Sequence, residues 1–408
     1  MSILTIIISL IVFSFLLELI IDLLNVKNLN SNIPTELNGI YDETEYKKSQ
    51  EYTKANTNFG FVNETFSFIL SLSVLSMGLL GQINEYLAQH LGEGIILSMI
   101  FFGLLFMLSD AISLPFQIYG TFVLEEKFGF NKTTPKLFVI DKLKGYLLTF
   151  VLGGAVIWIL MTLINVLGTI FWLYFWGVMA AIMFLMNMFY ASWILPLFNK
   201  LTPLEDGELK TAITEYSKKV QFPLDNIFVI DGSKRSNKAN AFFSGIGKKK
   251  KIVLYDTLIN QLSTEELVAV LAHEVGHFKK KHIVGTFILA IAQVGFMLYL
   301  LSHFINNEQL SAALGASKNF PHLNLIAFTI LYTPISMLTG IVMNLYSRKN
   351  EYEADAFASE TFSNIHLIEA LKKLSKNNLS NLTPHPALVF IGYSHPTVLQ
   401  RIRAMLKV

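Results

Sequence analysis

Long apolar runs alternate with polar segments along this chain, and the alternation predicts a bundle of membrane-spanning helices. A helix crosses a bilayer with about 20 apolar residues, and seven runs reach that length, at 3–24, 61–82, 92–118, 145–165, 168–195, 284–303 and 323–346. The fourth and fifth runs are nearly continuous, so their boundary rests on residues 165–168 alone. The first run lacks a basic leader and a small-residue cleavage site, which favours a retained helix over a removable signal peptide.

Composition and charge support this class of protein and orient it. Of the 408 residues, 52% are hydrophobic and only 15% are charged, which is typical of a polytopic membrane protein. Seven crossings put the polar segments alternately on two sides, and 31 of the 32 Lys and Arg residues then share one side, with only Lys318 opposite. The positive-inside rule makes the Lys- and Arg-rich side cytoplasmic. No basic face suits nucleic acid, so no nucleic-acid partner is expected.

The runs divide the chain into four expected parts. They are spans one to five with cytoplasmic loops (1–198), a soluble segment (199–282), spans six and seven (283–346) and a cytoplasmic helical segment (347–408). Within the soluble segment, residues 206–219 have the periodicity of an amphipathic helix, and residues 227–230 and 252–255 have that of short strands. We therefore expect a small α+β unit on the cytoplasmic side of the helices.

An H-E-x-x-H pattern near the end of the soluble segment is formed by His273, Glu274 and His277. Positions four apart share one face of a helix, so both imidazoles can bind one metal ion while Glu274 accepts a proton from water on that ion. Ser263 and Glu266 form a capping-box pattern that starts such a helix. The alternative is an ordinary helix that carries two histidines. We favour a zinc site.

The third ligand of a catalytic zinc site is expected to be a carboxylate, because the chain has no cysteine. Glu351 and Asp355 follow the seventh run and share one helix face. One of them can bind zinc, while the other accepts a hydrogen bond from a ligand histidine and fixes its tautomer. The alternative is an acidic helix start, where carboxylates interact with the positive end of the helix dipole. Glu353 fits that description.

Two further expectations concern residues close to or within the spans. The helix that carries His277 is expected to continue through residues 279–281 into the sixth run. His282 then lies off the ligand face and is expected to serve in packing or to lie at the surface rather than to bind the metal. Asp110 lies within the third run, where ionisable residues are costly. It indicates either a polar, water-filled interior or a position near a span end, beside a polar neighbour.

Eight segments together resemble one protein family. They are residues 126–132, 196–208, 233–236, 240–243, 252–258, 273–277, 347–358 and 393–402. In these segments the chain resembles the type I CAAX prenyl proteases, which are integral-membrane zinc metalloproteases related to the HtpX-like proteases. The resemblance covers most of the chain, and it implies that the seven spans enclose a large chamber.

The resemblance also implies a set of site residues. The ligands of one Zn²⁺ per chain are His273, His277 and Glu351, and Glu274 is the general base and acid. Asp355 lies beside the ligands, and His395 and Arg401 lie near the metal, where they stabilise the oxyanion or hold the carboxylates. An extended substrate pairs with an edge strand made of Asn240, Ala241, Phe242 and Phe243. Lys238 departs from the eukaryotic members, which carry His there, and this puts the substrate preference in question.

These features predict a zinc-dependent membrane endopeptidase that cleaves membrane-associated or lipidated, CAAX-type substrates through a zinc-activated water. Its partners are then a peptide or protein substrate and the lipid bilayer. A composition rich in Asn, Lys and Ile favours a bacterial cytoplasmic membrane, with the active site facing the cytoplasm and misfolded membrane proteins or small lipidated peptides as substrates. The alternatives are a transporter or scaffold with a degenerate metal helix, and an inactive chamber-forming binder. Metal-dependent cleavage separates them from the protease.

Overall fold

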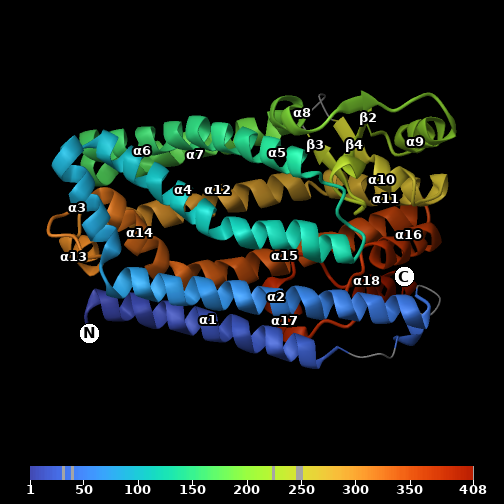
Figure 1. The fold of residues 1–408 in the computed structure, drawn as a ribbon. Coiled ribbons are helices and arrows are strands. Elements are labelled where there is room, and N and C mark those ends of the chain that lie inside the picture. The colour runs from blue at the N-terminus through green and yellow to red at the C-terminus, as the bar shows by residue number, and fades with distance from the viewer. Residues whose placement is uncertain (30–32, 38–40, 223–225, 245–250, 408) are drawn as a thin grey trace.

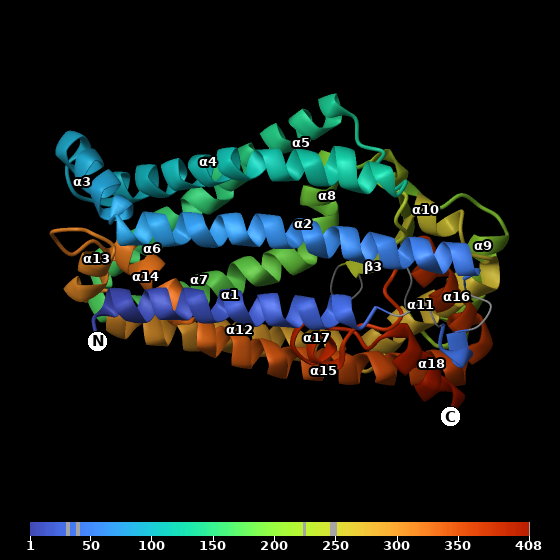
Figure 2. The same cartoon turned by 60° about the horizontal axis from the view of Figure 1, so that its bottom comes forward.

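The computed structural model describes residues 1–29, 33–37, 41–222, 226–244 and 251–407. Long helices run side by side along the length of the molecule, and a small sheet with several short helices lies at one end (Figure 1). The N-terminus lies at the end opposite the sheet, and the C-terminus lies at the sheet end (Figures 1 and 2). This arrangement agrees with the predicted order of spans and polar segments.

The long helices account for the seven predicted crossings. They are α1 (Ile3–Lys27), α2 (Glu43–Ser76), α4 (Ile95–Tyr119), α6 (Gly154–Leu167), α7 (Phe171–Phe189), α12 (His282–Phe304) and α15 (Thr333–Thr361). Among the described residues, five helices are long and apolar enough to cross a membrane, or six when α14 (Pro321–Leu331) and α15, bent by 55°, are one broken span.

One of those five helices reverses direction and so supplies two crossings. It covers Pro135–Phe198, which is 64 residues and about 96 Å at the helical rise of 1.5 Å per residue, far more than a bilayer needs. Gly168 has a φ of 55°, and from there α7 returns beside α6 (Figures 1 and 2). The predicted boundary between the fourth and fifth runs is confirmed at this glycine.

Shorter elements complete the fold. The helices are α3 (Leu79–Leu91), α5 (Pro135–Leu148), α8 (Leu195–Phe198), α9 (Glu208–Lys219), α10 (Asp256–Ile259), α11 (Thr264–Lys279), α13 (Glu308–Ala313), α16 (Asn364–Asn377), α17 (Pro386–Gly392) and α18 (Val398–Leu406). Turns of π-helix at Gly120–Glu125, Thr149–Gly153 and Tyr190–Ile194 extend α4, α5 and α7.

Helix α2 begins well before the predicted second span. The apolar run starts at residue 61, but the helix starts at Glu43. Asp42 accepts a hydrogen bond from the amide of Glu45 (2.7 Å), and the Glu45 carboxylate accepts one from the amide of Asp42 (3.2 Å). This capping box satisfies amides that a helix start leaves unpaired, so the polar front of α2 is helical although no hydrophobic period marks it.

The sheet has the order β1-β2-β4-β3, formed by β1 (Leu201–Pro203), β2 (Asn226–Ile230), β4 (Lys251–Tyr255) and β3 (Ala241–Ser244). Strands β2 and β4 are parallel, and the other two pairs are antiparallel. Ile252 and Leu254 of β4 pack in one buried cluster with Val268 and Leu271 of α11. The predicted α+β unit, with the H-E-x-x-H helix packed on the sheet, is therefore present.

Two predictions about helix continuity are wrong. Helix α11 ends at Lys279 and α12 begins at His282, because Lys281 takes the left-handed conformation (φ 59°) and redirects the chain. The sixth span is therefore not a continuation of the H-E-x-x-H helix. Helix α15 begins at Thr333, so Glu351 lies in its interior, and the interpretation as an acidic helix start fails.

Candidate active site

Helices α11 and α15 bring the predicted ligand residues together. The capping box that starts α11 is confirmed, because the Ser263 amide donates to the Glu266 carboxylate (2.8 Å) and the Glu266 amide donates to the Ser263 hydroxyl (3.3 Å). Gly276 allows α15 to approach closely, since an added Cβ there lies only 3.0 Å from the Ala354 Cα. The face of α11 that carries the histidines is thereby held against Glu351.

His273, His277 and Glu351 form a compact cluster that can hold a metal ion. Their ligand atoms all lie within 4.8 Å of one another. The two Nε2 atoms are 3.1 Å apart, and the Glu351 carboxylate lies 3.4 Å from His273 Nε2 and 3.2 Å from His277 Nε2. Two imidazoles and one carboxylate are a common ligand set of catalytic metal sites.

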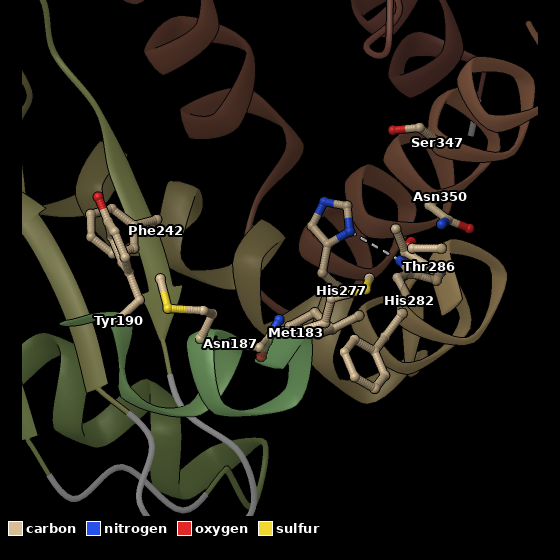
Figure 3. A pocket seen from close by; sticks show the side chains of 13 residues that line it. Met183, Asn187, Tyr190, Phe242, His277, His282, Thr286, Ser347 and Asn350 are labelled. Atoms are coloured by element: carbon tan, nitrogen blue, oxygen red, sulfur yellow. Dashed lines mark hydrogen bonds between the residues drawn. The ribbon is translucent and has the colours of Figure 1, made fainter. Parts of the chain in front are cut away.

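The remaining hydrogen bonds of the two histidines fit this role. His273 Nδ1 donates to Asp355 Oδ1 (2.8 Å). His277 Nδ1 contacts His282 Nδ1 (3.1 Å; Figure 3). The other ring nitrogen of His282, Nε2, contacts Glu353 Oε2 (3.1 Å). If His282 donates to the Glu353 carboxylate, its Nδ1 must accept from His277. Both neutral ligand rings then point the lone pair of Nε2 at the same position.

Such an arrangement favours a cation between the rings. Two facing lone pairs repel unless a proton or a metal ion lies between them, and Glu351 Oε2 is buried without a hydrogen-bond partner. Burial and Arg401 lower the pKa of His273, but Asp355 and Glu351 outweigh them and raise it to about 9. The surroundings therefore stabilise positive charge at this point, as a metal site requires.

His282 lies outside the cluster that can hold a metal ion, as expected, but it contacts His277 and is itself held by Glu353. His282 is buried and contacts His277, and Glu353 holds His282 instead of marking a helix start. The contact between His282 and His277 was not predicted, because the expectation was one continuous helix through residues 279–281. The break at Lys281 turns His282 back onto His277. The sequence signal for this contact was the presence of a third histidine, His282, five residues after His277.

Arg401 and His395, predicted to lie near the metal, reach the cluster from the C-terminal segment. Arg401 is buried and forms a two-pronged ion pair with Asp355 (Nε 2.8 Å, Nη2 2.6 Å). Its Nη1 lies 3.6 Å from Glu351. These contacts favour the second of its two expected roles, which is to hold the carboxylates. His395 Nε2 lies 3.2 Å from Glu351 Oε1, with the side chain 64% exposed.

A cleft of about 380 Å³ opens beside the cluster and is lined by His273, Glu274 and Glu351 on one side. Asn240, Ala241 and Phe242 line it from the sheet. Burial raises the pKa of Glu274 above its ordinary value, although the two histidines lower it. A carboxylate of raised basicity next to a metal position suits proton transfer.

Strand β3 is one of the two edge strands of the described sheet, as the predicted edge strand requires, and it pairs with β4 on one side. Asn240 precedes the strand instead of belonging to it, and its side chain accepts a hydrogen bond from the Ala241 amide (2.9 Å). Phe243 lies within the strand. An extended peptide can add to such an edge through main-chain hydrogen bonds.

Two other residues of interest have their own polar partners. Lys238 does not line the cleft, and its Nζ lies 2.9 Å from both the Tyr52 hydroxyl and the Glu125 carboxylate. Asp110 pairs with Lys142 of α5 (2.7 Å) and also bonds the Tyr146 hydroxyl. The polar neighbour expected for Asp110 is therefore present.

Helices that span a membrane, a His–His–Glu cluster and an adjacent glutamate in a cleft define a membrane metalloprotease. Residues 22–200 match the family model described as CAAX prenyl protease N-terminal, five membrane helices. Residues 203–408 match peptidase family M48.

Similar proteins extend the match to nearly the whole chain. CAAX prenyl protease 1 of Saccharomyces cerevisiae is 35% identical over 401 residues, which cover 92% of this chain and 88% of that protein. The human homolog is 31% identical, with 92% and 89% covered. The crystal structure of S. mikatae Ste24p superposes with a TM-score of 0.94 at 33% identity, over 99% of each chain. The chain therefore belongs to the CAAX prenyl protease 1 family of M48 peptidases.

Proposed function

We propose that this protein is a zinc-dependent endopeptidase of the membrane, and that it cleaves lipidated or otherwise membrane-associated substrates of the CAAX type. The observation that carries the proposal is the His273–His277–Glu351 cluster beside the free edge of β3. Relatives that cover most of the chain bear the name CAAX prenyl protease 1, which supports the substrate class.

Each residue of the cleft has a defined part in this proposal. His273, His277 and Glu351 hold one zinc ion, which when bound activates a water and polarises the scissile carbonyl. Glu274 takes the proton of the attacking water and delivers it to the leaving amine. Strand β3 aligns the substrate backbone, and Asp355 holds the His273 ring. Arg401 fixes Asp355, and His395 is close enough to Glu351 to contact a substrate in the same cleft.

The decisive experiment compares the wild type with Glu274→Gln as full-length protein in detergent. We expect one zinc ion per chain in both proteins, and cleavage of a lipidated CAAX peptide by the wild type alone. A chelator should abolish that cleavage, and added zinc should restore it. Absence of zinc from the wild type would refute the metal assignment. Zinc without cleavage of lipidated or plain peptides would favour an inactive binder of such peptides.

We also propose that the metal end of the molecule faces the cytoplasm, since the Lys and Arg residues concentrate there. The chain has no cysteine, so a single introduced thiol reports its side of the membrane. In sealed cells, a membrane-impermeant maleimide should label Lys318→Cys but not Lys407→Cys. The reverse pattern would overturn the orientation. We further propose that this is a bacterial cytoplasmic membrane, which the composition rich in Asn, Lys and Ile favours.

A further inference from the structure

A second cavity lies next to the cleft. It has a volume of about 680 Å³ and is bounded by α7 with its π-helical extension, β3, α11, α12 and α15. His277 and Phe242 line both this cavity and the cleft that holds Glu274. The cavity therefore adjoins the cleft beside the metal cluster, and we call it the α7–α12 pocket.

The walls of the α7–α12 pocket are largely apolar and adaptable. Met183, Met186 and Tyr190 line it from α7 and its extension, and Ile283 and Phe287 line it from α12. Figure 3 shows Tyr190 and Phe242 across the pocket from His277. Methionine side chains adapt their shape to flexible apolar ligands. None of the described lining residues is Lys, Arg, Asp or Glu, so these walls offer no such side chain to form an ion pair with a charged ligand.

We propose that the α7–α12 pocket receives the S-linked isoprenoid chain of the cysteine at the scissile bond, an inference that rests on the proposed function. A substrate paired with β3 turns successive side chains to opposite faces of the strand. The substrate residue whose peptide bond lies at the metal cluster can therefore extend its side chain past His277 into the pocket. The volume lies in the range of pockets that enclose small-molecule ligands.

The surrounding helices favour an apolar chain over a polar one. The pocket residues of α7 and α12 lie within or at the ends of two membrane spans, so an isoprenoid in the bilayer can reach the pocket along apolar surfaces. A pocket of similar volume, about 550 Å³, lies between α2 and α4 and contains Phe59 and Phe116. That pocket shares no lining residue with the cleft. It serves as the internal comparison.

Photo-crosslinking tests the location of the chain without requiring cleavage. Full-length Glu274→Gln protein is irradiated with a CAAX peptide whose S-linked isoprenoid carries a diazirine, and adducts are mapped by mass spectrometry. We expect adducts on Met183, Met186 or Phe287, which an excess of the unmodified farnesyl peptide suppresses. Adducts confined to Phe59, Phe116 or other lipid-exposed positions would overturn the proposal.

Filling the pocket tests its effect on specificity. Ala290 of α12 lines the pocket, and Ala292 of the same helix is exposed outside it, so Ala290→Trp and Ala292→Trp form a matched pair. The readout is the ratio of kcat/KM for an S-farnesyl peptide to that for the S-methyl peptide of the same sequence. We expect Ala290→Trp to lower this ratio at least tenfold and Ala292→Trp to leave it within twofold. An unchanged ratio in Ala290→Trp contradicts the proposal.

The two experiments separate this proposal from the proposed function. If the wild type cleaves neither peptide, the proposed protease activity fails, and the crosslinking pattern still decides whether the pocket binds the isoprenoid. If the wild type cleaves both peptides equally and the adducts lie elsewhere, the protease stands and the pocket assignment is lost.

Discussion

Gly276 lies within the H-E-x-x-H motif, where α11 touches α15, and its replacement by alanine tests how the ligand cluster is held. A Cβ at this position would lie 3.0 Å from the Cα and 3.1 Å from the carbonyl oxygen of Ala354, and 3.2 Å from the Cβ of Phe357. Favourable carbon contacts lie at about 3.5–4.0 Å. The two nearest atoms belong to the backbone and cannot rotate away. Helix α15 must therefore move by roughly half an ångström.

This movement is expected to lower both the stability of the protein and its affinity for zinc. Overpacking of this kind costs about 1–3 kcal/mol, against a gain of about 1 kcal/mol from the higher helix propensity of alanine. Glu351 lies one turn before Ala354 on α15, so the shift also displaces a ligand. Metal sites tolerate deviations of only about 0.2 Å in ligand distance. We therefore expect Gly276→Ala to weaken zinc affinity at least tenfold, or about 1.4 kcal/mol.

The assay is a competitive chelator titration of the protein in detergent, combined with thermal unfolding of the metal-free form. Gly340→Ala is the control, because Gly340 lies on α15 and an added Cβ there meets nothing within 4 Å. The control should bind zinc like the wild type. Wild-type zinc affinity in Gly276→Ala would refute the reasoning that Gly276 sets the spacing of α11 and α15.

Three further outcomes follow from the site. Glu274→Gln should keep its zinc while kcat/KM falls by about 10²–10⁴-fold, the usual value of positioned proton transfer, in a peptide-cleavage assay. His282→Phe should weaken zinc binding by about 10- to 100-fold in the chelator titration, since His277 loses the partner that orients it. In wild-type protein, zinc affinity should fall as the pH drops below about 9, because zinc must displace a proton from His273. A pH-independent affinity between pH 6 and 9 would contradict that displacement.

The sequence predicts those parts of the molecule that depend on local pattern. The spans follow from apolar length, the turn at Gly168 from a short interruption, and the H-E-x-x-H helix from its capping box. The edge strand β3 is predicted by the resemblance, and its place at the end of the sheet order agrees with that prediction. The spans, the turn and the capped helix are set by residues that are close together in the chain, so one sequence suffices to locate them. The edge strand depends on the resemblance.

Features that depend on tertiary contact are not predicted. Lys281 takes a left-handed conformation. Glycine or asparagine at this position would have predicted such a conformation, but lysine does not. The location of His282 depends on this turn. The polar start of α2 has no hydrophobic period, and its only local signal is the capping box of Asp42 and Glu45. The division of labour between Glu351 and Asp355 is also undetermined by spacing, because both share one helix face. In the structure, Asp355 pairs with Arg401 and bonds His273 Nδ1, whereas Glu351 faces the Nε2 atoms of both histidines.

His273 and His277 are held by different partners, a carboxylate and an imidazole. The difference depends on how the C-terminal segment packs against α15. Arg348 donates to the carbonyls of Val389 (3.0 Å) and Tyr393 (2.5 Å), which anchors the turn before α18 against α15. Helix α18 then inserts Arg401 beside Asp355, which is almost fully buried. A buried carboxylate without a cation is costly, so Asp355 needs Arg401 to hold His273. His277, on the side of the α7–α12 pocket, relies on the less charged His282–Glu353 pair. The described lining of that pocket consists of His277, His282, apolar side chains and uncharged polar ones, and it includes neither Asp355 nor Arg401.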